Sequence, residues 1–178
     1  MKRAYMVLSL CLIVLGLVSS GCMITVNSDS CSTARLEKNK AIARRDFEQV
    51  WNKGNLDTVD EIFAADGVGH MPGSPDIHSL EGTKQYVTMY RNAFPDIHFT
   101  IEDEIAQGDK VVIRWTSRGT HQGELMGISP TGKQCTVTGI TINRFSGGKI
   151  QESWNSWDAL GMLQQLGVVP PIGEGGKK

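Results

Sequence analysis

The sequence predicts an α+β fold in which helices come first, antiparallel strands follow and a short helix ends the domain. Three observations support this class. Apolar residues recur at helical spacing between residues 36 and 94, alternating strands joined by tight turns follow Pro95, and the strand–helix–strand order of a parallel sheet is absent. A chain of 178 residues is about one domain long. It can bury roughly two thirds of its unfolded surface, so it should fold without metal or disulfides.

Three helices are predicted before the strands. The first begins near Leu36 and ends at Gly54, where a left-handed cap belongs, and the second covers residues 56–64. The third covers residues 83–94 and stops before Pro95, which cannot continue a helix. Their inward-facing residues are Leu36, Ala43, Phe47, Val50, Trp51, Val59, Ile62, Phe63, Tyr86, Val87, Tyr90, Ala93 and Phe94. The tyrosines are expected in the core, although a phenol at the core edge can hydrogen-bond a ligand.

A long loop is predicted between the second and third helices, with the sequence AADGVGHMPGSPDIHSLEG. Its four glycines and two prolines disfavour regular structure. Loops of this length in a compact domain are usually functional or disordered. His70 either points into a cavity or is an exposed loop imidazole, and His78 is expected in solvent.

Alternation of apolar and polar residues predicts the strands. The buried sides of the first two strands are formed by Ile97, Phe99, Ile101, Val111, Ile113 and Trp115. Gly108 and Asp109 turn the chain between them, and Gly147 and Gly148 form the turn between two later strands. A short apolar helix then runs up to Gly167.

Polar side chains are set among tryptophans and aliphatic residues between residues 119 and 167. They are His121, Thr141, Asn143, Ser153, Asn155 and Asp158. This mixture is expected where a pocket binds an organic molecule, and the alternative is that these are surface and cap residues. Alternation puts Ser153, Asn155 and Trp157 on one face of the last strand. Asp158 is first explained as the N-cap of the final helix and only second as a catalytic carboxylate.

Charge and histidine spacing exclude several classes of protein. The net charge is −1 and no lysine or arginine cluster recurs on one face, so a nucleic-acid-binding protein is excluded. The four histidines are scattered over separate elements and no two stand at metal-ligand spacing. We therefore predict neither a metal site nor a cofactor.

The N-terminus has the features of an export signal. Lys2 and Arg3 precede an apolar run over residues 6–18, and small residues follow up to residue 21. The run is too short to span a bilayer comfortably, which takes about 20 residues. Residues 1–21 are therefore predicted to be a signal peptide, which places the mature protein in the cell envelope or outside the cell.

Cys22 directly follows the small residues, as in a bacterial lipobox, although Ser19 stands where leucine is usual. Lipidation of Cys22 would hold the protein on a membrane surface, and the alternative is plain cleavage and a secreted or periplasmic protein. Residues 22–34 are polar and suit a tether, residues 35–169 form the domain, and residues 170–178 form a flexible tail. Cys31 and Cys135 are expected as independent thiols, although an oxidising compartment would allow them to pair.

Three blocks of the sequence resemble one protein family. They are FPDIHFTIEDEIAQGDKVVIRW, GTHQGELMGISPTGK and RFSGGKIQESWNSWDALGMLQQLG. Their order and spacing are similar to those of the SnoaL-like polyketide cyclases, also called ester cyclases, over residues 36–169. The resemblance implies the conical α+β roll of nuclear transport factor 2, with helices in the concavity of a curved antiparallel sheet around an apolar pocket, in a homodimer.

The resemblance also implies a reaction, the intramolecular aldol closure of a polyketide methyl ester, which needs a base and an acid. The family's pocket aspartate falls on Asn155, which cannot accept a proton, and its histidine on the preceding strand falls on Thr141. His121 in the GTHQG segment matches a family histidine. The side chains expected to bind the substrate are Trp115, Thr141, Ser153, Trp157 and Tyr90.

Two interpretations of function follow. The first is an enzyme acting on a hydrophobic carbonyl compound, with His121 or His70 as base and Asn155 donating a hydrogen bond to an oxyanion. The second is a non-catalytic envelope lipoprotein whose pocket holds an apolar ligand. Export argues against the reaction of the biosynthetic cyclases themselves, because their substrates are made inside the cell.

Overall fold

The computed structural model describes residues 28–170. The elements in this range are α1 (Ser28–Arg45), the π-helix η1 (Asp46–Asn52), α2 (Asp57–Ile62), β1 (Phe63–His70), α3 (Leu80–Ala93), β2 (His98–Gln107), β3 (Lys110–Thr120), β4 (Gln134–Ser146), β5 (Lys149–Trp157) and α4 (Ala159–Leu166). The expected signal peptide, Cys22 and the tail beyond residue 170 lie outside the described residues. The order of helices and strands confirms the predicted α+β class.

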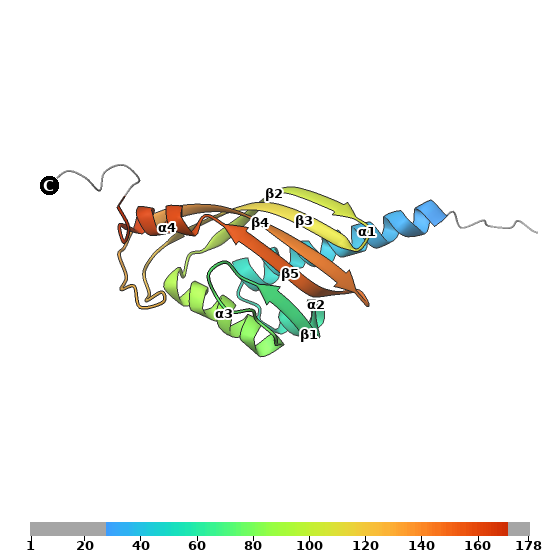
Figure 1. Ribbon diagram of the computed structural model, residues 1–178, viewed down its shortest axis with the longest axis horizontal. Coiled ribbons are helices and arrows are strands. Elements are labelled where there is room, and N and C mark those ends of the chain that lie inside the picture. Colours follow the sequence, from blue (N-terminus) through green and yellow to red (C-terminus); the bar gives the residue numbers. More distant parts are fainter. Residues whose placement is uncertain (1–27, 171–178) are drawn as a thin grey trace, which may run out of the picture.

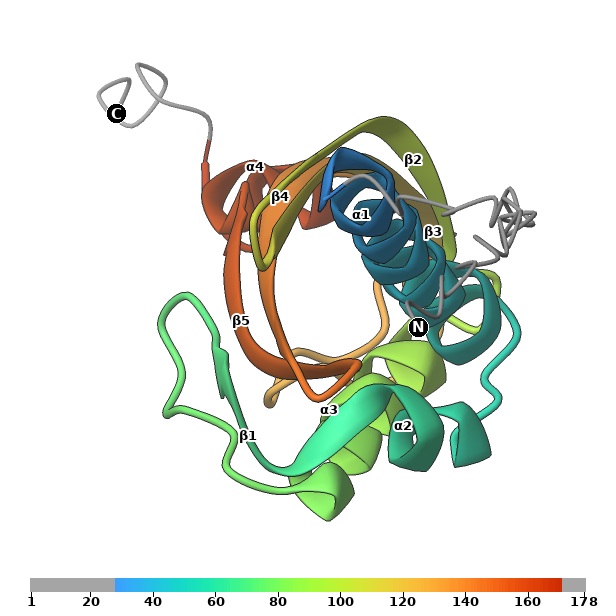
Figure 2. The same ribbon diagram turned by 90° about the vertical axis from the view of Figure 1, so that its right-hand side faces the viewer.

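The strands form one strongly curved sheet in the order β1-β5-β4-β3-β2. Strands β2 to β5 pair antiparallel, and β1 pairs parallel to β5 at the edge. Viewed end-on, the sheet curls around the interior, with α1, α2 and α3 across its open side (Figure 2). Figure 1 shows α4 at one end of the sheet, away from the free end of α1. The helices and the curled sheet together enclose the core.

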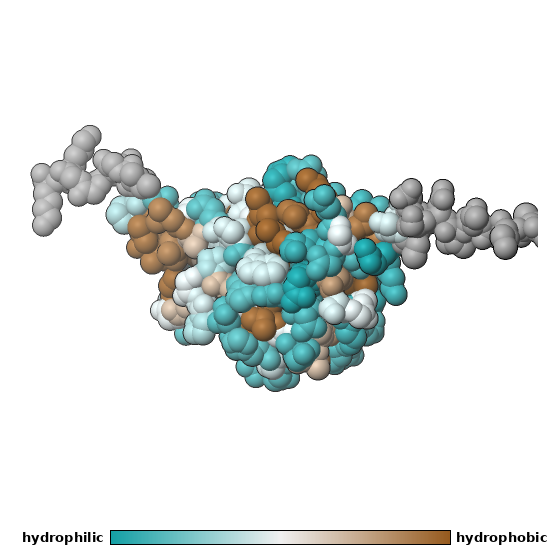
Figure 3. Space-filling view, turned by 45° about the vertical axis from the view of Figure 1, so that its right-hand side comes forward, coloured by the Kyte–Doolittle hydropathy of each residue, from teal (hydrophilic) through white to brown (hydrophobic). Residues whose placement is uncertain are grey.

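The core is made by the concave side of the sheet and the inner faces of α1, η1 and α3. Its largest cluster includes Ala43, Phe47, Tyr90, Phe94, Phe99, Val111, Ile113, Trp115 and Ile150. Large apolar side chains that remain exposed are Ile105, Met126, Ile140, Leu160 and Val168. Figure 3 shows apolar residues as separate patches among hydrophilic ones on one face of the molecule.

Local sequence explains where several elements begin and end. Gly147 and Gly148 adopt φ angles of 59° and 78°, the left-handed pair that a tight hairpin between β4 and β5 requires. Asp158 caps α4, because its carboxylate accepts a hydrogen bond from the Gly161 amide at 2.8 Å, which confirms the N-cap interpretation. Gly54, with φ 71°, lies just past η1 as predicted.

Several predicted boundaries are wrong, and the third helix begins at Leu80 instead of residue 83. Helix α1 begins at Ser28, eight residues before Leu36, so part of the expected tether is helical. Residues 32–35 are exposed, and apolar periodicity cannot detect a helical turn that has no buried apolar face. The second helix ends at Ile62, and residues 63–70 form β1 instead of the start of a loop. This strand has weak local propensity because it contains two glycines, and its pairing with β5 comes from distant sequence.

The indole ring of Trp115 lies directly over Gly139, its partner on the neighbouring strand. A methyl group at position 139 would stand 2.4 Å from the ring carbon Cζ2, well inside contact distance. Only a residue without a side chain therefore allows the indole to lie flat on β4. Trp115 is 6% exposed and contributes to both the core and the cavity described below.

We predict that Gly139→Ala displaces the Trp115 ring and lowers the free energy of unfolding by about 1–3 kcal/mol, the usual cost of overpacking. The measurement is urea unfolding followed by tryptophan fluorescence. Thr138→Ala, at an exposed neighbouring position on β4, is the control and should change little. Equal stability of the Gly139→Ala variant and the unmodified protein would contradict this packing.

Candidate active site

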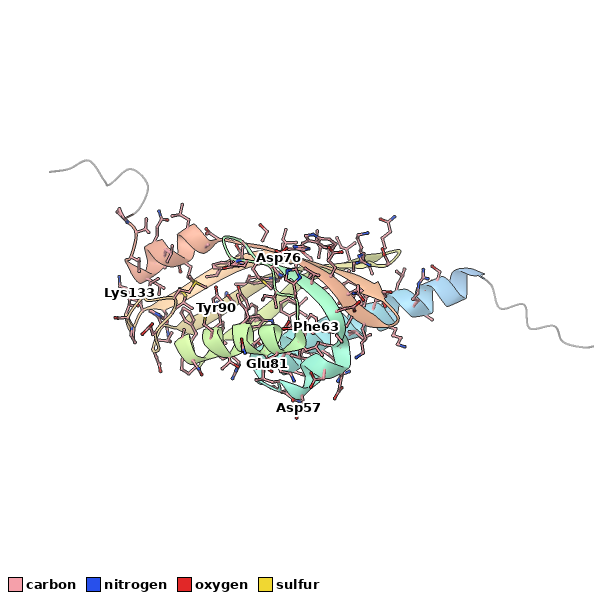
Figure 4. All side chains as sticks on the ribbon, turned by 60° about the horizontal axis from the view of Figure 1, so that its bottom comes forward. Asp57, Phe63, Asp76, Glu81, Tyr90 and Lys133 are labelled. Atoms are coloured by element: carbon pink, nitrogen blue, oxygen red, sulfur yellow. The ribbon has the colours of Figure 1, made fainter. Side chains whose placement is uncertain are left out.

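A cavity lies between the concave face of the sheet and the helices. It encloses about 1200 Å³ including its open mouth, and most of its wall is apolar. The aromatic residues of the wall are Phe47, Trp51, Phe63, Tyr86, Tyr90, Phe94, Phe99, Trp115 and Trp157. Figure 4 shows Tyr90 between α3 and the sheet and Phe63 where α2 meets β1. A mainly aromatic and apolar lining of this kind suits a hydrophobic organic molecule.

The expected substrate-binding residues all line this cavity. They are Tyr90, Trp115, Thr141, Ser153 and Trp157. Tyr90 comes from α3 and the others from the three central strands, so the structure brings together side chains far apart in the sequence. The Ser153 hydroxyl donates a hydrogen bond to Asn143 Oδ1 behind the wall.

Asn155 also lines the cavity, and a chain of hydrogen bonds fixes its orientation. Trp115 Nε1 donates to Thr141 Oγ1 at 3.0 Å, so the Thr141 proton is free to donate to Asn155 Oδ1 at 2.8 Å. Asn155 Nδ2 donates to the backbone oxygen of His70 at 3.3 Å. Because an amide nitrogen carries two protons, one N–H of Asn155 has no acceptor among residues 28–170 and can donate to a ligand.

Asp46 is a buried carboxyl group in the wall of the cavity. It is the first residue of η1 and only 7% exposed. Within residues 28–170 its side chain has no hydrogen bond or ion pair. Burial raises the pKa of Asp46 from 3.8 to about 7, because the surrounding apolar groups penalise the charged form. The group can therefore exchange a proton near neutral pH, which an ordinary aspartate cannot.

Sequence reasoning missed Asp46, although the chain holds a signal for it. Asp46 lies three residues after Ala43 and four before Val50, on the apolar stripe of the first helix. A charged residue on the buried face of a helix usually either has a hydrogen-bond or ion-pair partner or takes part in a reaction. The π-helix that begins at Asp46 could not be predicted from apolar spacing, and such helices are frequent at functional sites.

The two tyrosines of the wall, Tyr86 and Tyr90, lie side by side with ring centroids 5.0 Å apart. Burial raises the pKa of both phenols above the ordinary value of 10. Both therefore stay protonated at neutral pH and can act as hydrogen-bond donors to a ligand, the alternative that the sequence analysis left open beside a core role.

His121 does not line the cavity, and the expectation that it projects inward is wrong. It is fully buried against the Phe94 ring, with centroids 5.1 Å apart. Its Nδ1 accepts a hydrogen bond from the Thr131 amide at 3.2 Å, so this histidine supports the loop between β3 and β4. The sequence indicates that His121 is buried, but it does not show whether the side chain is buried under a loop or faces the cavity.

His70 also lies outside the cavity wall, at the end of β1. Its Nδ1 is 3.0 Å from Asp76 and its Nε2 is 3.1 Å from Glu152, and its ring stacks on Trp154. The hydrogen bond to Glu152 raises the pKa of His70, with a further contribution from Asp76 and a smaller opposing effect of burial. A protonated imidazole between two carboxylates is a poor general base. His70 is thus neither inside the cavity nor a free loop side chain.

Residues 28–170 contain no group of three or more histidine, cysteine, aspartate or glutamate side chains placed to hold a metal ion. In the same range no helix is both long and apolar enough to cross a membrane. Cys135 is a buried free thiol.

Comparison with known proteins agrees with this geometry. The family model of the SnoaL-like polyketide cyclases matches residues 41–166. The aklanonic acid methyl ester cyclase DnrD of Streptomyces peucetius is 28% identical over 134 residues, which cover 74% of this chain and 92% of DnrD. The crystal structure of IdmH from Streptomyces antibioticus has a TM-score of 0.64 and 34% identity over 72% of this chain and 98% of IdmH. TsrD from Streptomyces laurentii, 23% identical over 75% of this chain and 97% of TsrD, has the same fold with a TM-score of 0.68.

The curved sheet, the helices across its open side and the apolar cavity define a roll of the nuclear transport factor 2 type, as the sequence predicted. Within this class, the chain belongs to the SnoaL-like polyketide cyclase family. The comparisons thus support the family and the fold, whereas the cavity with Asn155 and Asp46 is observed in this chain.

We predict that Asp46→Asn stabilises the protein at pH 8 by about 2–4 kcal/mol, since each unit of pKa shift is worth about 1.4 kcal/mol. The pKa is raised on folding, so the native state holds its proton above pH 3.8 while the unfolded chain loses it. Stability of the unmodified protein therefore falls between about pH 4 and pH 7, and the advantage of the variant should vanish near pH 4.

Urea unfolding at pH 4 and pH 8 measures this difference. Glu48→Gln removes an exposed carboxylate two residues further along the same π-helix and should change little at either pH. An Asp46→Asn variant that is less stable than the unmodified protein at pH 8 would show that the carboxylate has a partner.

Proposed function

We propose that the protein closes a ring on a hydrophobic carbonyl compound of the polyketide type by acid/base chemistry in the cavity. The observation that carries the proposal is an aromatic, apolar wall that holds a fixed amide donor, Asn155, and a buried carboxyl group, Asp46. A site built only to store an apolar ligand needs neither group. Family membership and the named activity of DnrD on aklanonic acid methyl ester support the same substrate class.

The reaction is an intramolecular aldol closure. A base removes a proton from a carbon next to one carbonyl, and that carbon forms a bond to a second carbonyl carbon of the same molecule. The electron pair of the second C=O bond moves to its oxygen, which then takes up a proton. No atom is gained or lost overall, so the product is an isomer of the substrate.

The cavity offers donors for the carbonyl oxygen that becomes negative when the base removes a proton from the neighbouring carbon. The free N–H of Asn155 is held by the hydrogen bonds to Thr141 and His70, so little reorganisation is needed when charge develops. The phenols of Tyr86 and Tyr90 keep their protons and offer further donors. Asn155 itself cannot accept the proton from carbon, so the base must be another group.

We expect the purified protein to convert aklanonic acid methyl ester, or a shorter linear polyketide methyl ester, into a cyclic isomer of equal mass. Asn155→Ala should lower kcat by about 100-fold, the usual cost of removing one oxyanion donor. Ser156→Ala, at the exposed neighbouring position on β5, should leave kcat unchanged. Liquid chromatography with mass spectrometry separates the isomers and gives the rates.

The alternative is a binding protein without catalysis, favoured by the amide at the position of the family's aspartate. Native mass spectrometry of the purified protein tests it through retained apolar ligands. A tightly held ligand together with no turnover of any polyketide ester would support the binding protein and contradict the cyclase. Turnover that is insensitive to Asn155→Ala would remove Asn155 from the reaction.

The proposal extends to location: export followed by lipidation of Cys22. Its support is the charged start, the apolar run and the small residues before Cys22. Cys22→Ser should abolish the mass increase of the acyl chains and release the protein from membranes, as mass spectrometry and fractionation measure. A mature protein of unmodified mass that begins at Cys22 would contradict lipidation. Association with a second copy stays a prediction.

A further inference from the structure

We propose that Asp46 is the general base of this cavity. The group that removes the proton of the substrate then lies in the helix layer and not on β5. The inference rests on the proposed function, since a base is useful only if the bound compound carries an acidic C–H. It assigns a role to a residue outside the three sequence blocks that resemble the family. A general base of this cavity must be a wall group that is free to accept a proton.

Two carboxyl groups line the cavity within the described part of the chain, Asp46 and Glu152. Glu152 is engaged on both oxygens: Oε1 with His70 at 3.1 Å and Oε2 with Arg144 at 2.9 Å. These contacts, the His70 hydrogen bond first, lower the pKa of Glu152 and make it a weak base. Asp46 has no such partner, and its carboxylate remains free to take a proton.

The histidines cannot take this role from where they lie. His121 is separated from the cavity by Phe94, and its Nδ1 is occupied by Thr131. His70 is held between Asp76 and Glu152 outside the wall, where both contacts favour the protonated ring. Among the described residues, Asp46 is thus the free proton acceptor with access to the cavity.

The position of Asp46 fits a two-sided site. Asp46 comes from η1, which packs on β2, while Asn155 comes from β5 in the sheet. A compound lying in the cavity therefore meets the carboxylate from the helix layer and the amide donor from the sheet. Base and oxyanion donor act on different atoms of the substrate, so their separation on two elements suits the reaction.

The proposed proton transfer and ring closure conserve atoms and charge. The Asp46 carboxylate takes a proton from the carbon next to a carbonyl, and the C–H electron pair forms an enolate. The enolate oxygen accepts a hydrogen bond from the Asn155 N–H. The enolate carbon then bonds to the second carbonyl carbon, and the protonated Asp46 returns its proton to the new alkoxide. The carboxylate is restored and no other reactant is consumed.

The test separates proton removal from ring closure. The probe is 2-tetralone, an apolar ketone with acidic C–H groups, incubated with the full chain in D2O. Proton NMR follows the loss of the α-protons. We expect exchange catalysed by the unmodified protein to fall about 100-fold or more in Asp46→Asn, within the range that a general base contributes. Asp46→Glu should restore part of the rate, and Glu48→Gln should behave as the unmodified protein.

The pH dependence gives a second readout that a structural role would not produce. Exchange by the unmodified protein should rise with pH through a single ionisation near pH 7 and then level off, because only the carboxylate accepts a proton. The residual exchange of Asp46→Asn should lack this step. Tryptophan fluorescence should show that the variant still binds the ketone, since Asp46→Asn removes charge without changing size.

Each outcome decides between the proposals. Exchange that depends on Asp46, together with no cyclisation of polyketide esters, would keep Asp46 as base and reject the cyclase. Cyclisation or exchange that persists in a folded Asp46→Asn variant would overturn Asp46 as base and leave the cyclase standing. Bound 2-tetralone that exchanges no protons in the unmodified protein would also overturn it.

Discussion

An unpaired carboxyl group held in an apolar wall is the constraint on which the site depends. Asp46 occupies a position on the buried stripe of the first helix where an aliphatic residue would pack without cost, and no countercharge among residues 28–170 offsets its burial. Folding therefore has to supply enough apolar contact elsewhere, and the aromatic cluster around Phe47, Phe99 and Trp115 does so. The destabilised charged form is what makes the group useful, because a raised pKa brings proton transfer into the neutral range.

The opposite wall of the cavity, formed by the sheet, holds a neutral hydrogen-bond donor in a fixed orientation. Thr141 and Asn155 are direct cross-strand partners on β4 and β5, and the Trp115 indole, lying over Gly139, fixes the direction of their hydrogen bonds. An asparagine in this chain keeps one N–H for a ligand without introducing a second buried charge. In the proposed site the ionisable group thus comes from the helix layer and the hydrogen-bond donor from the sheet, with a mainly apolar wall around them.

Much of the fold could be predicted from the sequence, because period-2 and helical patterns report directly which side of an element is buried. The strands carrying Phe99, Trp115 and Asn155 and the cap at Asp158 follow from such patterns. Strand β1 could not be predicted, since its glycines have weak strand propensity and its partner lies more than eighty residues away. The site was only half predictable: side chains on regular strands were placed correctly, whereas His121 and His70 belong to loop and rim contacts that no local pattern encodes. Asp46 could not be identified as a free buried carboxyl group, because a local pattern does not show whether a charged residue on a helix stripe has a partner in the fold.

The ionisation of Asp46 in the folded protein tests this account most directly. In protein labelled with ¹³C at the aspartate side-chain carboxyl, the Asp46 resonance, assigned with the Asp46→Asn variant, can be followed by NMR from pH 3 to pH 9. The account predicts a midpoint near pH 7, about three units above that of an exposed aspartate. A midpoint near pH 4 would mean that the carboxylate is solvated or paired, and the proposed base, together with the division of the site between helix and sheet, would be wrong.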